Sequence, residues 1–275
     1  MLLKHKKKRL IFCINSGRCG SNYLAELLGS ADKVISFHEK KPRMIGRYLR
    51  MIENEEYKNS YKKRMIKVKS ILWSQLLKKK EKIYCETNHM FIKTFFDVVS
   101  DYFKDIDVII LRRNLSSVLK SFLELGYFDN SFSKSTKWSK WMCRSDSKTK
   151  AIEPLYDYDK MDQYDKIISY LIDIEARTQR YIKEYPNVKI TQVRIEELNN
   201  YDNVINLFDS LNLKVSNKTK NIYQKKINSR MKGKEKTNIK TTLDYCEDRI
   251  NNYVKKAKEN QIKVPATLEL STQNS

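Results

Sequence analysis

The sequence predicts an α/β fold in three layers, with a central parallel sheet that helices cover on both faces. Three observations lead to this prediction. Short apolar runs rich in β-branched residues lack strict alternation, as is typical of buried parallel strands. Stretches with helical spacing separate these runs, and such strand–helix alternation is typical of α/β folds. A short glycine-bearing turn joins the first strand to the first helix.

The first strand is expected at residues 10–14. The helix after it has an apolar stripe of Leu24, Leu27 and Leu28 and ends at Gly29. Apolar runs predict the other strands at residues 34–37, 83–85, 106–111 and 188–193. Apolar residues three or four positions apart predict helices at residues 61–77, 91–103, 115–125, 164–185 and 203–211, and a last helix at 241–260.

The 275 residues are expected to form one domain, 1–275. Two parts depart from the strand–helix pattern. Residues 127–164 are polar, rich in aromatic residues and poorly periodic, which is typical of a surface loop or lid. Residues 214–275 form a C-terminal part that begins with a basic segment and continues into the last helix.

The formal net charge of +22 predicts an anionic partner. A nucleic acid, an acidic membrane face, a polyanionic sugar and a charged nucleotide all fit this charge. The sequence has no apolar run long enough for a transmembrane helix and no room for a cleavable signal before the first strand. The five cysteines lack metal-ligand or CxxC spacing, so we expect free thiols, a cytoplasmic protein and no metal site.

The turn after the first strand has the features of an anion-binding loop. Loop N–H groups and the positive end of a helix dipole converge on one point in such a turn. Gly17 and Gly20 allow tight turns and close approach of a ligand, and Arg18 adds a permanent charge. The nucleotide-hydrolase pattern G-x-x-x-x-G-K-[ST] is absent, because Ser21 follows the last glycine directly. The loop therefore predicts a phosphate or sulfate site; the alternative is a turn that binds nothing.

A second anion site is predicted after the strand at residues 106–111. Arg113 follows this strand, and Ser121 lies eight residues later, about two helical turns away. An arginine and a hydroxyl so placed can hold one compact oxyanion. A nucleotide hydrolase would have an acidic residue at this strand end to hold magnesium. The alternative is that Arg112 and Arg113 only solvate the strand end.

Four segments resemble motifs of the sulfotransferases. Residues 16–22 (SGRCGSN) resemble the 5′-phosphosulfate loop, and residues 113–121 (RNLSSVLKS) resemble the 3′-phosphate motif R-D-P-R-D-V-x-x-S. Residues 192–198 (QVRIEEL) are similar to the v-x-Y-E-D-L segment, and residues 86–89 (ETNH) to the K-T-P-x-h segment. Their order and spacing agree with the family over residues 9–213.

The resemblance implies a P-loop NTPase-like α/β/α fold and the donor 3′-phosphoadenosine 5′-phosphosulfate (PAPS). It implies transfer of a sulfuryl group to a hydroxyl or amine of a carbohydrate, lipid, peptide or small molecule. Arg113 and Ser121 would hold the 3′-phosphate, and Arg18 would also stabilise charge on the leaving phosphate. The 5′-phosphosulfate would be held by Gly17, Arg18, Cys19, Gly20, Ser21 and Asn22.

The resemblance also suggests a catalytic base. Glu39 follows the second predicted strand, where tyrosyl-protein and bacterial sulfotransferases place a catalytic glutamate, so we expect Glu39 to accept the proton of the acceptor. Cytosolic members use a histidine, which makes His38 and His89 the alternatives. Glu39 would have no such role if it were an exposed carboxylate paired with Lys40 or Lys41.

The sequence departs from the family pattern in three places. Asn114 and Leu115 replace D-P, which predicts a less rigid turn. Glu86 replaces a lysine, which Lys93 or the C-terminal segment would have to supply. The glycine-rich C-terminal clamp has only a loose substitute around Gly233, namely Lys225, Arg230, Lys232 and Lys234.

Two other functions are considered. A P-loop small-molecule or nucleoside kinase would have the same kind of α/β fold. This sequence, however, lacks the lysine of the kinase loop and an acidic residue at the strand end. A basic nucleic-acid-binding protein would fit the net charge, although the sequence contains no recognised zinc-finger, RRM or basic-zipper pattern.

Overall fold

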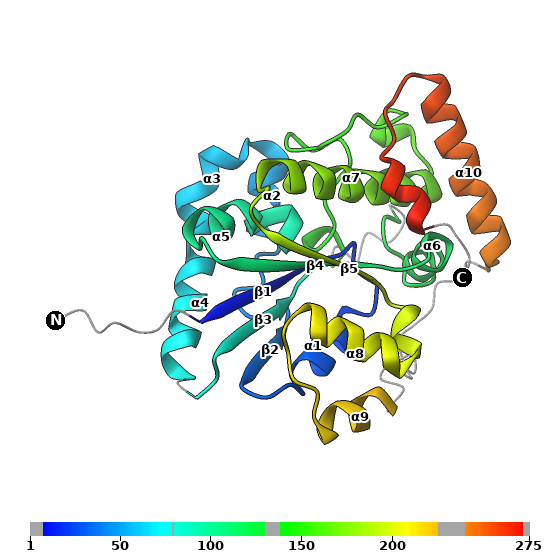
Figure 1. The fold of residues 1–275 in the computed structure, drawn as a ribbon. Coiled ribbons are helices and arrows are strands. Elements are labelled where there is room, and N and C mark those ends of the chain that lie inside the picture. The colour runs from blue at the N-terminus through cyan, green and yellow to red at the C-terminus, as the bar shows by residue number, and fades with distance from the viewer. Residues whose placement is uncertain (1–7, 79, 130–137, 225–239, 272–275) are drawn as a thin grey trace.

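A five-stranded parallel sheet forms the centre of the computed structural model, which describes residues 8–78, 80–129, 138–224 and 240–271 (Figure 1). The strand order is β2-β3-β1-β4-β5, and every neighbouring pair is parallel. All five predicted strands are present and differ from the expected bounds by one or two residues. They are β1 (Arg9–Ile14), β2 (Val34–His38), β3 (Ile83–Thr87), β4 (Ile106–Arg112) and β5 (Lys189–Arg194).

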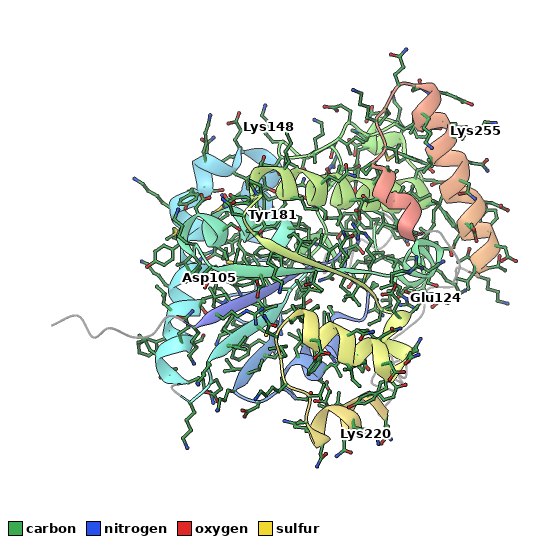
Figure 2. The ribbon with its side chains drawn as sticks, viewed as in Figure 1. Asp105, Glu124, Lys148, Tyr181, Lys220 and Lys255 are labelled. Carbon is green, nitrogen blue, oxygen red and sulfur yellow. The ribbon has the colours of Figure 1, made fainter. Side chains whose placement is uncertain are left out.

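Helices cover both faces of the sheet, which confirms the three-layer α/β/α prediction (Figure 1). One face carries α1 (Ser21–Leu28), α8 (Tyr201–Ser210) and α9 (Asn217–Gln224). The other carries α5 (Phe96–Tyr102), α6 (Leu115–Glu124) and α7 (Gln163–Glu184), with α10 (Leu243–Glu259) packed outside α6 and α7. Tyr181 of α7, labelled in Figure 2, is buried with its ring against Phe91 and Phe96. Among the described helices, none has both the length and the apolar character that crossing a bilayer requires.

The helix expected at residues 61–77 is two helices, α3 (Tyr57–Arg64) and α4 (Ile66–Leu77). Arg64, the last residue of α3, precedes the break at Met65, and its side chain is fully buried. Its guanidinium donates to both carboxylate oxygens of Asp97 and to the carbonyl of Thr94. The spacing of apolar residues at 61–77 carries no information about a contact with residues 94 and 97. The sequence therefore predicted one continuous helix there. It also missed α2 (Arg47–Asn54) and α9.

The helix expected at residues 91–103 begins with a π-helical turn, Phe91–Phe95, and continues as α5. Such turns are rare and often occur at functional sites. The side chain of Lys93, in the middle of this turn, is fully buried. The turn follows β3 after the short link of residues 88–90, so it brings Lys93 close to the carboxyl edge of the sheet.

The turn after β4 is closed by Asn114, which is the N-cap of α6. Its side-chain oxygen accepts hydrogen bonds from the backbone N–H of Ser117 at 3.0 Å and from the Ser116 hydroxyl at 2.6 Å. A capping asparagine satisfies one of the free amides at a helix start. Asn114 thus fixes the start of α6 where the related motif has aspartate.

A buried ion pair fastens the connection after β2 to β3. Glu86 is fully buried, and it accepts hydrogen bonds from Lys67 Nζ at 2.6 Å, from the Tyr84 hydroxyl at 2.6 Å and from the Asn88 amide at 3.0 Å. Lys67 also donates to the carbonyl oxygens of Lys40 and Pro42, at 3.0 and 3.2 Å. Glu86, which stands where the related motif has lysine, therefore anchors the segment that begins with Glu39.

We predict that Lys67→Met lowers the free energy of unfolding by about 3–5 kcal/mol, because it leaves the Glu86 carboxylate buried without its charge partner. The double variant Lys67→Met/Glu86→Gln should recover part of this loss. Lys69→Met, at an exposed position of the same helix, should change stability by less than about 0.5 kcal/mol. Urea denaturation measures all three variants, and a Lys67→Met protein as stable as Lys69→Met would contradict the prediction.

Candidate functional site

Four strand ends bring the predicted site residues to one edge of the sheet. The loop of residues 15–20 follows β1, and Glu39 follows β2. His89 comes two residues after β3, and Arg113 comes directly after β4. Because β3 and β4 are the two neighbours of β1, the loop lies between His89 on one side and Arg113 on the other. Ligands of open α/β sheets bind at this edge.

The backbone of the loop has the shape of an anion cradle. Gly17, Arg18 and Gly20 have φ values of +88°, +60° and +80°, in the left-handed region. Successive residues that include such conformations turn their amides toward a common point. Gly20 is the N-cap of α1 without a side-chain hydrogen bond to that helix end, so the first amides of α1 remain available. A Cβ on Gly20 would lie 2.7 Å from the Ile195 side chain, so a larger residue would displace Ile195 in addition to the strain at positive φ.

The loop is held from its inner side. The backbone N–H of Gly17 donates to Asn15 Oδ1 at 2.9 Å, and the Tyr170 hydroxyl donates to the Ser16 carbonyl at 2.6 Å. The Cys19 thiol is buried with its sulfur 3.1 Å from Ser16 Oγ, and burial raises its pKa. The thiol therefore faces the interior, and only the backbone amide of Cys19 remains for contact with a ligand.

The two segments predicted to bind anions meet each other. Arg18 Nε donates to Ser121 Oγ at 3.0 Å, and Arg113 Nη1 donates to the Arg18 carbonyl at 3.0 Å. Arg112, by contrast, is buried and donates to Glu175 and Gln192, at 2.5 and 2.6 Å. Of the two arginines at the end of β4, Arg113 is the one that reaches the loop, where it adds positive charge beside Arg18 and the start of α1.

Glu39 lies across the edge from Arg113, and its contacts are with histidines. Its Oε1 atom is 3.4 Å from His89 Nε2 and 3.7 Å from His38 Nε2. The Lys40 ammonium instead lies 4.0 Å from the centre of the Phe37 ring. The backbone of Glu39 is left-handed, with φ +51°, and its N–H donates to the Thr87 carbonyl at 3.2 Å. The side chain of Glu39 is 18% exposed, whereas that of His89 is 5% exposed.

Behind His89 lies buried Lys93, which the sequence suggested only as a substitute for the motif lysine that Glu86 replaces. Lys93 Nζ is 2.6 Å from His89 Nδ1, 2.8 Å from the Trp141 carbonyl and 3.1 Å from the Tyr170 hydroxyl. Burial lowers the pKa of Lys93 to about 7, and burial beside Lys93 holds the pKa of His89 well below its usual range. Tyr170 was not predicted at all, because it lies in α7, far from every motif in the sequence.

The segment of residues 127–164, expected to be a lid, contacts His89 and approaches the loop through Trp141 and Met142. The Trp141 ring stacks on His89 with centroids 5.7 Å apart, and Met142 Cε is 3.6 Å from where a Cβ of Gly17 would lie. The segment is anchored further along, since the backbone N–H of Ala151 donates to Asp173 of α7 at 2.7 Å. Residues 130–137, and the basic cluster around Gly233, lie outside the described residues.

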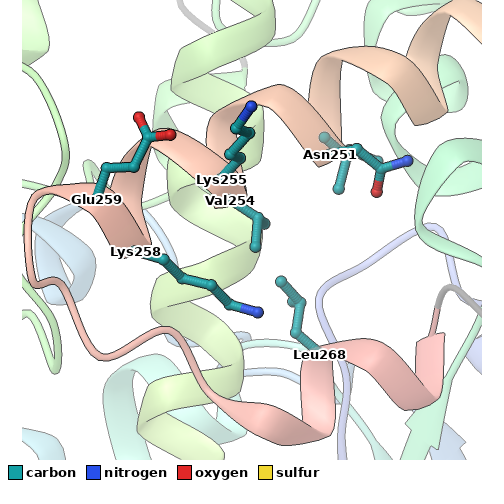
Figure 3. A pocket seen from close by; sticks show the side chains of 7 residues that line it. Asn251, Val254, Lys255, Lys258, Glu259 and Leu268 are labelled. Atoms are coloured by element: carbon teal, nitrogen blue, oxygen red, sulfur yellow. The ribbon is translucent and has the colours of Figure 1, made fainter.

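Cavities lie both at the loop and away from it. A small one beneath the loop is lined by Asn15, Ser16, Cys19 and Arg113, among others. Another, of about 440 Å³, lies between α10 and the C-terminal 3₁₀ helix Ala266–Ser271, where Figure 3 shows the Lys258 ammonium beside Leu268. This second cavity contains none of the predicted site residues, so the sheet edge remains the candidate site.

We predict that the buried Lys93 makes stability depend on pH. Its pKa is about 7 in the folded protein and 10.5 for an exposed lysine, so the unfolded chain binds more protons between these values. The free energy of unfolding should therefore rise with pH, by about 2 kcal/mol between pH 7 and pH 9, relative to Lys93→Met. Urea denaturation of both proteins at each pH measures this gain. A difference between them that stays constant over this range would contradict the prediction.

Comparison with known proteins bears on the fold. No protein-family model matches the chain, and no curated protein matches it. Among solved structures, a sulfotransferase from Alicyclobacillus acidocaldarius aligns with a TM-score of 0.50 and 12% identity over 98% of each chain. The sulfotransferase domain of the Synechococcus PCC 7002 olefin synthase aligns with a TM-score of 0.50 and 14% identity, over 97% of this chain and 94% of the other. At these identities the likeness concerns architecture, and the chain has the fold of the sulfotransferases.

Proposed function

We propose that this chain is a sulfotransferase that moves a sulfuryl group from PAPS to a hydroxyl or amine of an acceptor. The observation that carries the proposal is the contact of Arg113 with the Arg18 carbonyl, 3.0 Å long, beside the start of α1. It makes two anion-binding segments neighbours at the ligand-binding edge of the sheet, as a nucleotide with phosphate groups at two positions requires. The sulfotransferase fold supports the same function.

The donor would lie with its 5′-phosphosulfate on the loop and its 3′-phosphate at the start of α6. Backbone amides of residues 17–22 and the Arg18 guanidinium are the donors for the first group. Arg113 and Ser121 are the donors for the second. The Ser121 hydroxyl can donate to a phosphate while it accepts from Arg18 Nε, and the other N–H groups of the Arg18 guanidinium can serve the 5′ side.

In the proposed reaction the acceptor oxygen or nitrogen attacks sulfur while the bond from sulfur to the bridging phosphate oxygen breaks. Glu39 accepts the acceptor proton, and 3′-phosphoadenosine 5′-phosphate (PAP) leaves with the electron pair of the broken bond. Arg18 and the amides of the loop are fixed positive groups beside the oxygen that gains charge. Arginine stays protonated near neutral pH, so Arg18 stabilises this charge without giving up a proton.

Glu39 is a better candidate for the base than His89. Both ring nitrogens of His89 are engaged, Nδ1 by Lys93 and Nε2 by Glu39. The pKa of His89 is held well below its usual range, which makes it a poor proton acceptor. His38 Nδ1 is 3.1 Å from the Thr87 carbonyl, and its Nε2 faces Glu39. Because the Thr87 carbonyl requires a proton on His38 Nδ1, a neutral His38 presents a lone pair to Glu39, and His89 is the histidine that suits a role in orienting the carboxylate.

The segment of residues 127–164 is proposed to contact the acceptor, which the stacking of Trp141 on His89 supports. The acceptor itself is proposed only as a class: a carbohydrate, lipid, peptide or small molecule. A reducing, cytoplasmic location is proposed from the cysteines, all five of which are buried free thiols.

We predict that PAP raises the melting temperature more than ATP, GTP or NAD does, because only PAP presents a 3′-phosphate to Arg113 together with a 5′-phosphate. Arg113→Ala should weaken PAP binding about 10- to 100-fold, the value of one charged hydrogen bond. It should weaken binding of adenosine 5′-phosphosulfate much less. Arg50→Ala, at an exposed position of α2, serves as the control. Preferential stabilisation by ATP would instead favour a kinase.

We also predict that Glu39→Gln lowers kcat by about 10²–10⁴-fold, the usual contribution of a general base. PAP affinity, measured by calorimetry, should stay close to that of the unchanged protein, because Glu39 lies on the acceptor side. Glu26→Gln, at an exposed position of α1, controls for loss of a negative charge. Turnover that survives Glu39→Gln would remove Glu39 from this role.

A further inference from the structure

We infer that Lys93 is a positioning residue for Glu39: its ammonium fixes the tautomer of His89, so that the Nε2–H of His89 is directed at the Glu39 carboxylate. This inference rests on the proposed function for its catalytic consequence, but its structural content can be tested without any turnover. Lys93 is fully buried and lies behind His89, so it acts through the histidine.

The hydrogen-bond partners of Lys93 determine the tautomer of His89. Below its pKa of about 7 Lys93 is protonated, and an ammonium group has three donors and no acceptor. Three acceptors surround it: His89 Nδ1 at 2.6 Å, the Trp141 carbonyl at 2.8 Å and the Tyr170 hydroxyl at 3.1 Å. His89 Nδ1 must then carry a lone pair, and the proton of the neutral ring resides on Nε2. That atom is 3.4 Å from Glu39 Oε1, so the ring can donate to the carboxylate.

The opposite tautomer would be unfavourable on both sides of the ring. A proton on Nδ1 would face the ammonium of Lys93, and a lone pair on Nε2 would face the Glu39 carboxylate. Each contact would replace an attraction with a repulsion in a buried place, where such interactions are strong. Without Lys93, only the contact with Glu39 would favour the Nε2–H form, and an Nδ1–H form could find water or a carbonyl.

Stability alone does not account for a lysine at this position. Burying a charged group costs free energy, and the lowered pKa of Lys93 reflects this cost. An apolar side chain would avoid it. Besides burial, four groups affect the pKa of Lys93 electrostatically: Cys143, Glu39 and Glu53 raise it, and Arg177 lowers it. The π-helical turn of residues 91–95 further departs from ordinary helix geometry at this residue.

Lys93 also connects the acceptor side with the donor loop. The Tyr170 hydroxyl accepts from Lys93 and donates to the Ser16 carbonyl at 2.6 Å. Hydrogen bonds thus run from His89 through Lys93 and Tyr170 to Ser16, and Glu39 Oε1 lies 3.4 Å from the other ring nitrogen of His89. Tyr170→Phe removes the branch to the loop but leaves the Lys93–His89 contact, so it is the matched control for the tautomer.

Nitrogen-15 NMR of the histidine rings tests the inference directly. The chain has three histidines, so His5→Asn and His38→Asn variants suffice to assign the His89 signals. At about pH 6, where Lys93 is protonated, we expect a protonated Nε2 and an unprotonated Nδ1 in the full-length protein and in Tyr170→Phe. In Lys93→Met we expect a mixture of tautomers. A protonated Nδ1 in the unchanged protein, or a Lys93→Met spectrum identical to it, would overturn the inference; the first outcome does not depend on the variant's folding.

Kinetics tests the consequence for Glu39. Lys93→Met should lower kcat by about 10- to 100-fold, the cost of a misplaced catalytic group. The affinity for PAP should change less than kcat does. A normal kcat in Lys93→Met, together with a kcat that does fall in Glu39→Gln, would contradict the positioning role. If PAP fails to bind or Glu39→Gln leaves turnover unchanged, the proposed function fails. The NMR measurement still tests the tautomer of His89 in that case.

Discussion

The parallel alignment of β1, β3 and β4 is the constraint on which the candidate site depends. The register pairs Cys13 of β1 with Thr87 of β3 and with Ile109 of β4, so the segments that follow these strands start at one edge. The loop, His89 and Arg113 follow the three strands in turn. A shift of any one strand would separate groups that now touch. The site is thus a property of the hydrogen-bonded sheet, and the loops inherit their placement from it.

Two buried lysines support the two halves of the site in different ways. Lys67 is paired with Glu86 and holds the carbonyls of Lys40 and Pro42, so it fixes the backbone next to Glu39. Lys93 has neutral acceptors around it and fixes side chains through hydrogen bonds. The carboxylate of Glu86 raises the pKa of Lys67 against the effect of burial, whereas burial among neutral hydrogen-bond acceptors lowers the pKa of Lys93 to about 7. The first suits a structural role and the second a role in proton placement.

Three separate features concentrate positive charge at the carboxyl edge of the sheet. The start of α1 contributes amides and the helix dipole, Arg18 contributes a guanidinium held by Ser121, and Arg113 donates to the loop backbone. Arg112, one residue earlier, is neutralised by Glu175 on the opposite side. Arg112 is the last residue of β4 and pairs with Glu175, whereas Arg113 lies just beyond the strand and reaches the loop.

The sequence by itself determined the elements whose signals are local. Five apolar runs became the five strands, and α6, α7 and α10 begin at capping residues Asn114, Asp162 and Thr242 close to where helical spacing starts. The loop was recognised because glycines at positive φ and an uncapped helix start are encoded by neighbouring residues. The expected roles of Glu39, Arg113 and Ser121 remain predictions.

Only the tertiary structure decided what joins these elements. Arg64, beside the break at Met65, pairs with Asp97, and Glu86 pairs with Lys67. The residues that connect Glu39 to Ser16 come from the ends of β1, β2 and β3, from the π-helical turn and from α7. Local spacing fixes which face of a helix or strand a residue occupies. Contacts between residues far apart in sequence are set by register and packing across the whole sheet, which no local pattern records.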